Sequence, residues 1–441
     1  MSRIKGRKAF YLLTALFFIL GLITVLVDSL IPRLKDVFTL TYFQAGFIQF
    51  AFFGAYFLLS IPSSYFLSKV GYQKGTQFSL FLMGLGCLLF LPAANYRVFS
   101  LFALACFTLA GGMTLLQVSI NPFITELGSP ETAAKRLTLA QAFNSLGTTI
   151  APAIGAMFIL RDRVIEQSTI DLMNEAEKLA YYDLEAAAVN APFMVLAAIL
   201  VGLGMIFIWF KMPSIIPPRS IGSYAQALKN KRLKMGMLGI FCYVGAEVSL
   251  GSYLVNYFIS LDAANLIIQS EGLRSFVSSI LDENLTSYDE KAIVGVFITF
   301  YWGGAMIGRF FGAFIMQYIP PAKVILGFGL MAFSFLTLSI NTAGLLAMFA
   351  ALAVGFCNSI MFPTIFSLAL QELGELKPKG SGLLCTAIVG GALIPPTFGA
   401  LIDWKGFAIA MLLIMACYLY LSYLGFYFQK REARASTLSA D

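Results

Sequence analysis

One carboxylate stands out because it lies inside an apolar stretch long enough to cross a membrane. The stretch runs from Ala9 to Ile31, and apart from the phenol of Tyr11 its only ionisable side chain is that of Asp28. An acid inside a membrane-spanning helix costs about 2.5–3.5 kcal/mol on insertion scales, so such residues usually face a cavity and bind ions or protons. We therefore expect Asp28 to bind a cation or a proton; the alternative is an acid near the outer helix end that reaches water.

A second acid and several amides lie in other apolar stretches. Glu247 is in the middle of residues 235–260, where it could bind hydroxyl groups, bind a cation, or serve as a protonated partner of another helix. Gln141 and Asn144 are three residues apart and so share one helical face. Amides donate and accept hydrogen bonds, which suits neighbouring sugar hydroxyls, although they also join helices to one another. The candidate substrate-binding residues are Gln49, Gln117, Gln141, Asn144, Glu247, Asn358 and Trp302, whose indole could stack on a sugar ring.

Composition excludes most other classes of protein. The 441 residues are 59% hydrophobic and 12% charged, whereas soluble domains have about 25% charged residues. Histidine is absent, so proton or cation chemistry must use carboxylates and neutral oxygens. The six cysteines lie in apolar segments without a CxxC pair, which indicates packing rather than metal binding. The net charge of +7 suits anionic lipid rather than nucleic acid.

The apolar stretches predict an all-α membrane protein with twelve spanning helices. With about 20 residues needed for each span, they fall at 9–32, 42–68, 76–95, 98–127, 137–160, 190–211, 235–260, 292–318, 323–341, 344–372, 380–402 and 406–429. We expect an N-terminal six-helix half (1–211), a cytoplasmic linker (212–234), and a C-terminal six-helix half with a short cytoplasmic tail (235–441). The termini and linker are basic and the loops 161–189 and 261–291 are acidic, which predicts both termini in the cytoplasm.

The two halves repeat weakly in sequence. GTTIAPAIG at 147–155 and GALIPPTFG at 391–399 share the spacing Gly-x4-Pro-x2-Gly, and each follows a Glu-Leu-Gly segment, at 126–128 and 372–374. Parallel six-helix repeats place a substrate site at mid-membrane between the halves. The glycines and prolines would let these helices pack closely and bend; ordinary helix kinks are the alternative.

Several long motifs resemble one family of transporters. The stretches VDSLIP (27–32), LTYFQAGFIQFAFFGAYF (40–57), QVSINPFITELG (117–128), LAQAFNSLGTTIAP (139–152), YVGAEVSLGSYLVNY (243–257) and NSIMFPTIFSLAL (358–370) resemble the fucose–galactose–glucose:cation symporters of the major facilitator superfamily. The resemblance is greatest to bacterial glucose/galactose transporters. It implies the twelve-helix major facilitator fold in two six-helix pseudo-repeats and uptake of a hexose with a cation.

The resemblance also suggests roles for individual residues. It implies that Asp28 couples sugar movement to the cation and that Gln141 and Asn144 contact the sugar. Fucose permeases have a Glu at the position of Gln117, and this departure favours Na⁺ over H⁺, because a carboxamide oxygen can ligate Na⁺ but cannot be protonated. We therefore expect cation coupling at Asp28 and Gln117, with Na⁺ bound at Asp28. The alternative is proton-coupled symport of the fucose type.

These observations together predict a secondary active hexose importer that works by alternating access. We expect a monomer in the bacterial inner membrane whose partners are a hexose, a cation and the bilayer, with no other cofactor and no nucleic acid. Two other functions are a drug or metabolite efflux antiporter of the same fold and a membrane enzyme such as a lipid-linked glycosyltransferase. The paired amides disfavour the first, and the lack of clustered carboxylates or histidines disfavours the second, so an enzyme is not expected.

Overall fold

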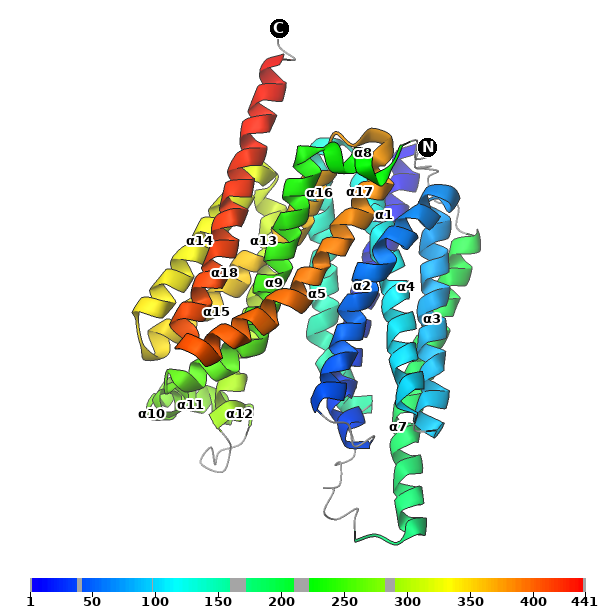
Figure 1. The fold of residues 1–441 in the computed structure, drawn as a ribbon, viewed down its shortest axis with the longest axis vertical. Coiled ribbons are helices and arrows are strands. Elements are labelled where there is room, and N and C mark those ends of the chain that lie inside the picture. The colour runs from blue at the N-terminus through cyan, green and yellow to red at the C-terminus, as the bar shows by residue number, and fades with distance from the viewer. Residues whose placement is uncertain are drawn as a thin grey trace. The chain divides into compact units, whose positions relative to one another are not determined.

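The computed structural model describes residues 2–37, 42–96, 98–158, 172–209, 222–281 and 290–438. Within these ranges, the side chains of 2–7, 26–37, 42–52, 152–158, 182–189 and 432–438 are outside the description. The described backbone is helical and contains no strand, as the sequence predicts (Figure 1). Contacts divide the chain into two compact units. Unit 1 comprises Met1–Pro130, Phe143–Lys229 and Glu372–Thr386, and unit 2 comprises Glu131–Ala142, Asn230–Gln371 and Ala387–Asp441.

Unit 1 is a bundle of long apolar helices. It contains α1 (Ser2–Val37), α2 (Tyr42–Val70), α3 (Tyr72–Tyr96), α4 (Phe99–Glu126), the later part of α5 (Ala133–Phe158), α7 (Glu175–Trp209), the short α8 (Tyr224–Lys229) and α17 (Lys377–Thr386). The helix α3 packs along both α4 and α7, and α17 packs against α2 and α4 (Figure 1). This bundle therefore includes a helix from late in the sequence.

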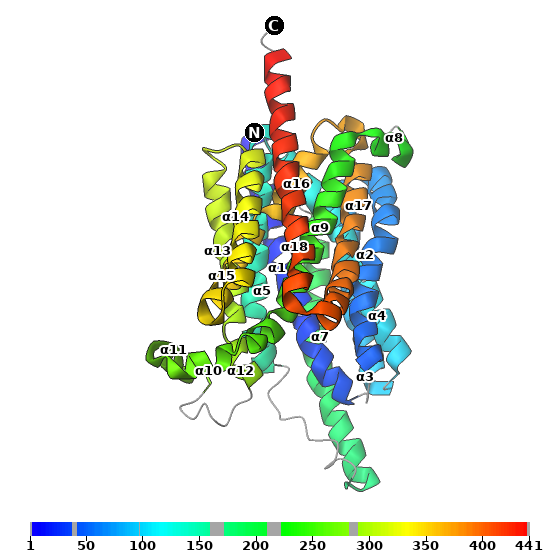
Figure 2. The same cartoon turned by 60° about the vertical axis from the view of Figure 1, so that its left-hand side comes forward.

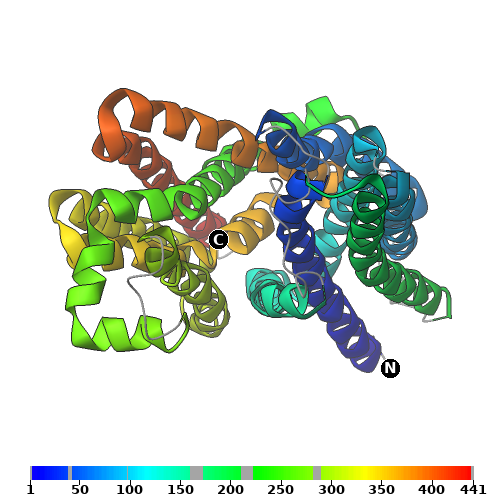
Figure 3. The ribbon, with the colours of Figure 1, turned by 90° about the horizontal axis from the view of Figure 1, so that it is seen from below.

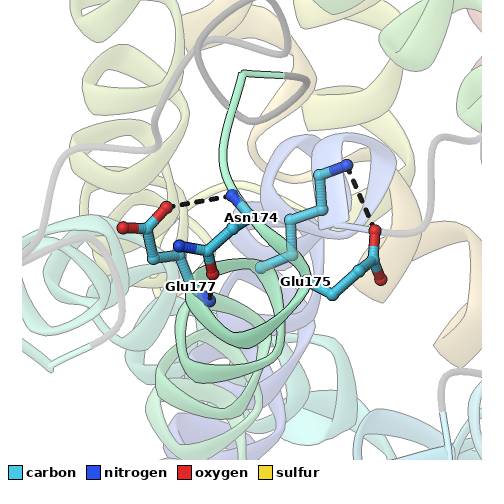
Figure 4. A network of polar contacts seen from close by, with 4 residues as sticks. Asn174, Glu175 and Glu177 are labelled. Carbon is cyan, nitrogen blue, oxygen red and sulfur yellow. Dashed lines mark hydrogen bonds and ion pairs between the residues drawn. The ribbon is translucent and has the colours of Figure 1, made fainter.

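The helix α7 begins earlier than the apolar pattern predicts. We expect a loop over 161–189, but the chain is helical from Glu175. Asn174 and Glu177 form a reciprocal cap in which the Glu177 amide donates to Asn174 Oδ1 (2.9 Å) and the Asn174 amide donates to Glu177 Oε2 (3.0 Å) (Figure 4). Lys178 and Glu175 form an ion pair of 3.6 Å beside it. Such capping boxes start helices, so this polar segment is helical without being apolar.

Unit 2 contains the remaining helices. These are α9 (Lys231–Ser260), α10 (Ala263–Gln269), α11 (Glu271–Ser278), α12 (Glu290–Gly295), α13 (Ile298–Ile315), α14 (Pro321–Asn341), α15 (Gly344–Asn358), α16 (Met361–Leu370) and α18 (Gly390–Leu438), with the first residues of α5. The helix α18 packs on α9 and α14, and α13 packs on α15. The short helices α10 to α12 lie across the lower ends of the longer ones (Figures 2 and 3).

Helix breaks in unit 2 fall both within a predicted span and between predicted spans. The expected helix 344–372 is divided into α15 and α16 by a turn at residues 359–360. Within α18, Gly406 has a φ of 79°, a left-handed conformation that glycine adopts without strain, and it separates two helical segments. This position agrees with the predicted boundary between spans 380–402 and 406–429.

Nine stretches of the described residues are long and apolar enough to cross a membrane. The longest, Gly374–Arg431, contains the two segments joined at Gly406. The helices α2 and α5 extend into residues outside the described side chains. The expected count of twelve therefore stays a prediction, as does the division at a linker over 212–234.

Close helix contacts through glycine occur in both units. In unit 1, a Cβ at Gly147 of α5 would overlap the backbone carbonyl of Phe18 in α1. In unit 2, a Cβ at Gly390, the residue before the motif at 391–399, would overlap the carbonyl of Phe241 in α9. Small residues let helices approach this closely in membranes. Glycine at these two positions therefore allows α5 to pack against α1 and the start of α18 to pack against α9.

Candidate functional site

A buried polar cluster of unit 2 is centred on Asn358, the last residue of α15. Its side chain is 0% exposed. The amide nitrogen donates to the Tyr301 hydroxyl (2.7 Å) and the amide oxygen accepts from the Tyr418 hydroxyl (2.6 Å). Because both ends of the amide are bonded to protein, Asn358 joins α13, α15 and α18 in this structure and does not present an open group to a ligand.

Tyr301 extends this cluster to Glu247. The Tyr301 hydroxyl donates to the backbone carbonyl of Glu247 (3.2 Å) on α9. The Glu247 side chain is half-buried and is hydrogen-bonded to the hydroxyl of Tyr243, four residues earlier on the same helix. The carboxyl group is therefore held beside a hydroxyl donor in the middle of a spanning helix.

Arg309 of α13 is the charged group that acts on Glu247. Its Nε donates to the carbonyl of Ser359 (3.2 Å) at the turn between α15 and α16. Its Nη1 donates to the carbonyl of Gln141 (3.3 Å) in α5. Arg309 lies within α13 and joins that helix to α5 and to the turn after α15, all in unit 2.

The amides of unit 1 bond to neighbouring helices. The Nε2 of Gln117, a half-buried residue of α4, donates to the Tyr56 hydroxyl on α2 (2.8 Å). The Nδ2 of Asn144, also half-buried, donates to the backbone carbonyl of Phe17 on α1 (2.9 Å). These bonds agree with the alternative interpretation of the amides as links between helices. Each bond uses one of the two N–H groups of the amide, and no bond of either amide oxygen is described.

The predicted pair Gln141 and Asn144 lies on one helix but is divided between the units. Gln141, which is 9% exposed, belongs to unit 2, and Asn144 belongs to unit 1. A single helix thus carries candidate ligands for both units. Whether the two side chains contact one sugar stays a prediction.

Trp302 neighbours the Tyr301 cluster. Its ring is 46% exposed and meets the Tyr301 ring edge to face at a centroid distance of 5.1 Å. It also packs where a Cβ of Gly251 on α9 would lie. The stacking of this indole on a sugar stays a prediction.

Two predicted residues lie outside the described side chains. Asp28 belongs to α1 and Gln49 to α2, and nothing is described of either side chain. Among the described residues, no group of three or more Cys, Asp or Glu side chains could hold a metal ion. Cation coupling and Na⁺ binding at Asp28 therefore remain predictions.

The sequence did not predict the four tyrosines that bond the candidate residues. Tyr243, Tyr301 and Tyr418 connect the amide of Asn358 to Glu247, and Tyr56 positions Gln117. A signal existed for Tyr243, since residues four apart on a helix share a face. The other three come from different helices, so only the packing brings them to their partners.

The comparisons identify the class of protein to which this fold belongs. Residues 12–384 match the model of the Major Facilitator Superfamily. The crystal structure of the transporter FucP in the outward conformation superimposes with a TM-score of 0.84 at 29% identity, covering 96% of this chain and 99% of that one. The fold is therefore that of a multi-pass membrane transporter, not of an enzyme.

Two relatives indicate a narrower family within this superfamily. A Brucella abortus protein described as a glucose/galactose transporter is 43% identical over 416 residues, 94% of this chain and 92% of that protein. The L-fucose-proton symporter of Escherichia coli is 32% identical over 406 residues, 90% of this chain and 87% of that protein. The chain belongs to the Major Facilitator Superfamily and, within it, to the fucose–galactose–glucose:cation symporter family, which confirms the predicted resemblance.

Proposed function

We propose that this chain is a secondary active importer of a neutral hexose of the glucose/galactose class, driven by a cation gradient. The observation that carries the proposal is the 43% identity with a glucose/galactose transporter over 94% of the chain. Identity at this level spans both sequence halves.

The chemistry of the described residues supports a hydroxylated, uncharged substrate. Each unit contains half-buried polar groups within apolar helices, including Gln117 and Asn144 in unit 1 and Glu247 in unit 2. Amide and carboxyl oxygens accept hydrogen bonds, and tyrosine hydroxyls both donate and accept, as the hydroxyls of a hexose do. These groups suit a substrate with many hydroxyls and need no charge on it.

Asp28 is the proposed coupling group of the first half. A cation bound there would neutralise the carboxylate and lower the cost of moving the loaded site across the bilayer. The membrane potential supplies about 2.3 kcal/mol for each charge per 100 mV, which a cation symporter can use to concentrate a neutral sugar. Gln117 favours Na⁺ at this site, whereas the relative named as an L-fucose-proton symporter favours H⁺.

The proposed location is the bacterial inner membrane, with both termini in the cytoplasm and the monomer as the working unit. The bacterial relatives support the location. The charges of the terminal segments and of the acidic loops support the orientation.

Uptake by the purified protein in proteoliposomes tests the function and the cation. Labelled glucose and galactose are offered with an inward Na⁺ gradient at clamped pH, and separately with an inward proton gradient in sodium-free medium. We expect accumulation above equilibrium with one of the two gradients. We expect Asp28→Asn to lose that accumulation, because the coupling carboxylate is gone. Wild-type protein that exchanges neither sugar across the membrane would contradict the proposed function.

A further inference from the structure

The amides of Gln117 and Asn358 have the same kind of partner. Each residue lies five positions before a proline, in the fourth predicted span of its sequence half. Each side-chain nitrogen donates to a tyrosine hydroxyl on the second span of the same half, to Tyr56 at 2.8 Å and to Tyr301 at 2.7 Å. Each unit therefore contains one amide–tyrosine pair of this kind.

The two pairs differ at the amide oxygen. In unit 2, the oxygen of the fully buried Asn358 accepts from the Tyr418 hydroxyl, which lies on the last span of that half. In unit 1, the last span is residues 190–209 of α7, which contain no Ser, Thr or Tyr. Gln117 is only half-buried, and no bond of its amide oxygen is described. The amide of unit 2 is thus bonded at both ends, whereas that of unit 1 has an acceptor open to a further partner.

A second amide lies one helical turn further along the same face of α4. Asn121 follows Gln117 by four residues, so the two side chains are neighbours on the helix surface. The side chain of Asn121 is 0% exposed, and within the described part of the chain neither its nitrogen nor its oxygen has a hydrogen-bond partner. Buried polar groups almost always have a partner in protein or in ordered water. This face of α4 therefore has unused hydrogen-bonding groups on two successive turns, as expected where a hydroxyl-bearing ligand supplies the partners.

Tyr56 determines which end of the Gln117 amide is open. A glutamine amide has an acceptor at its oxygen and donors at its nitrogen, and rotation by half a turn exchanges the two ends. The bond to the Tyr56 hydroxyl uses the nitrogen, so the oxygen is the end left for another partner. The Tyr56 side chain is buried, and α2, which carries it, packs along α4. The tyrosine hydroxyl is therefore held where it can keep the amide in this orientation.

We propose that Tyr56 is a positioning residue that fixes Gln117 as the hydrogen-bond acceptor for one hydroxyl group of the hexose. The hydroxyl donates its hydrogen to the Oε1 atom of Gln117. A contact of this kind requires a hydrogen on the ligand oxygen, so neither a fluorine nor a C–H group at the same position of the sugar can replace the hydroxyl. This inference rests on the proposed hexose import and adds to it one position at which the sugar must act as a donor.

A panel of sugar analogues tests the donor requirement in the wild type. Counterflow of the labelled hexose is measured in proteoliposomes and inhibited with analogues in which one hydroxyl at a time is replaced by hydrogen or by fluorine. Fluorine accepts hydrogen bonds weakly and donates none. At one position of the sugar we expect both analogues to inhibit about three- to tenfold more weakly than the parent hexose, the loss of one neutral hydrogen bond.

Two variants and their combination test the role of Tyr56. Tyr56→Phe keeps the ring but releases the amide, which can then present its N–H groups to the sugar. We expect the KM of counterflow to rise about three- to tenfold at an unchanged maximal rate. At the same position of the sugar, the disadvantage of the fluorine analogue should narrow. Gln117→Leu should abolish discrimination at that position, and adding Tyr56→Phe to it should raise KM no further, because Tyr56 acts through Gln117.

A matched control separates this effect from a general change in α2. Tyr65 lies on the same helix with an exposed side chain, and Tyr65→Phe should keep the wild-type KM and the wild-type response to the analogues. If Tyr56→Phe does not fold, the comparison of Gln117→Leu with the wild type still decides, because discrimination must disappear at one position of the sugar.

Four results would overturn the proposal. The wild type binds the fluorine analogue at every position as well as it binds the hexose. Tyr56→Phe retains the wild-type KM and discrimination. The effects of Tyr56→Phe and Gln117→Leu on KM are additive. Tyr56→Phe raises only the Na⁺ concentration needed for uptake, which would make Gln117 a cation ligand. Absence of hexose counterflow in the wild type would instead contradict the proposed function itself.

Discussion

At the scale of single residues, the hydrogen bonds that a candidate ligand already makes to other side chains change its interpretation. As an amide in an apolar stretch, Asn358 is a predicted sugar contact. The structure shows it with both polar ends bonded to tyrosine hydroxyls and 0% exposed. An amide in this setting positions its neighbours, and its contact with a sugar would require that these bonds first break.

Replacing Asn358 should therefore cost stability. In Asn358→Ala the hydroxyls of Tyr301 and Tyr418 lose a buried partner, and each such loss costs about 1–3 kcal/mol. We expect the melting temperature in detergent to fall clearly below that of the wild type. The exposed Asn341→Ala is the matched control, since its side chain bonds only the Thr337 carbonyl of its own helix. Equal melting temperatures for the two variants would contradict the positioning role.

At the scale of elements, α17 supplies a hydrogen bond to a backbone carbonyl that a proline leaves unbonded within α4. Pro122 within α4 has no amide hydrogen, so the carbonyl of Val118 loses its bond within the helix. The hydroxyl of Ser381 on α17 donates to that carbonyl (2.9 Å). Four residues before Ser381, Lys377 pairs with Glu126 at the end of α4. One face of α17 thus completes the hydrogen bonding and the charge balance of α4.

The short helix α8 is attached to the same region. The Tyr224 hydroxyl bonds the hydroxyl of Ser64 (2.7 Å) and donates to the Ile61 carbonyl (3.0 Å). Lys379 donates to the carbonyl of Gly222. Burial is the main cause that raises the pKa of Tyr224 above its ordinary value, so the hydroxyl keeps its proton at neutral pH. The segment before α9 is therefore held against α2 and α17.

The ion pair between Lys377 and Glu126 can be tested by charge exchange. Both side chains are 29% exposed, so the pair contributes about 0.2–1 kcal/mol. Lys377→Glu should lower the melting temperature, because two carboxylates would then face each other. Adding Glu126→Lys should restore most of the loss in low salt. A double variant no more stable than the single one would show that the pair contributes nothing.

The close contacts at Gly147 and Gly390 predict a second effect at this scale. In Gly147→Ala the new methyl group would meet the Phe18 carbonyl, and in Gly390→Ala it would meet the Phe241 carbonyl. Overpacking of this kind costs about 1–3 kcal/mol, so both variants should melt earlier. Gly202→Ala is the control: its Cβ would have nothing within 4 Å, and alanine favours a helix. Unchanged melting of the first two would contradict the close approach.

At the scale of the whole molecule, the charge distribution predicts the orientation in the membrane. The termini are basic and the loop 261–291 has two basic residues against six acidic ones. Alkaline phosphatase, which is active only outside the cytoplasm, should be inactive when fused after residue 441 and active when fused after residue 281. Activity in the reverse pattern would contradict the orientation.

Much of the fold could be predicted because helix formation in a membrane depends on local sequence. Apolar stretches of about 20 residues located the long helices, and the boundary expected between 402 and 406 agrees with the left-handed Gly406. The early start of α7 was missed because its first residues are polar. The Asn174–Glu177 capping box is the local signal that could have shown it.

The sequence by itself determined the class of protein, the candidate acids and amides, and the family, since each depends on composition or on contiguous motifs. Only the tertiary structure decided which groups meet. It joined Asn358 to two tyrosines, bonded Arg309 to the carbonyls of Gln141 and Ser359, and paired Ser381 with the carbonyl that Pro122 leaves without its helical partner. The physical reason is that a hydrogen bond or a charge contact between distant segments depends on how helices pack, and no spacing along the chain encodes that distance.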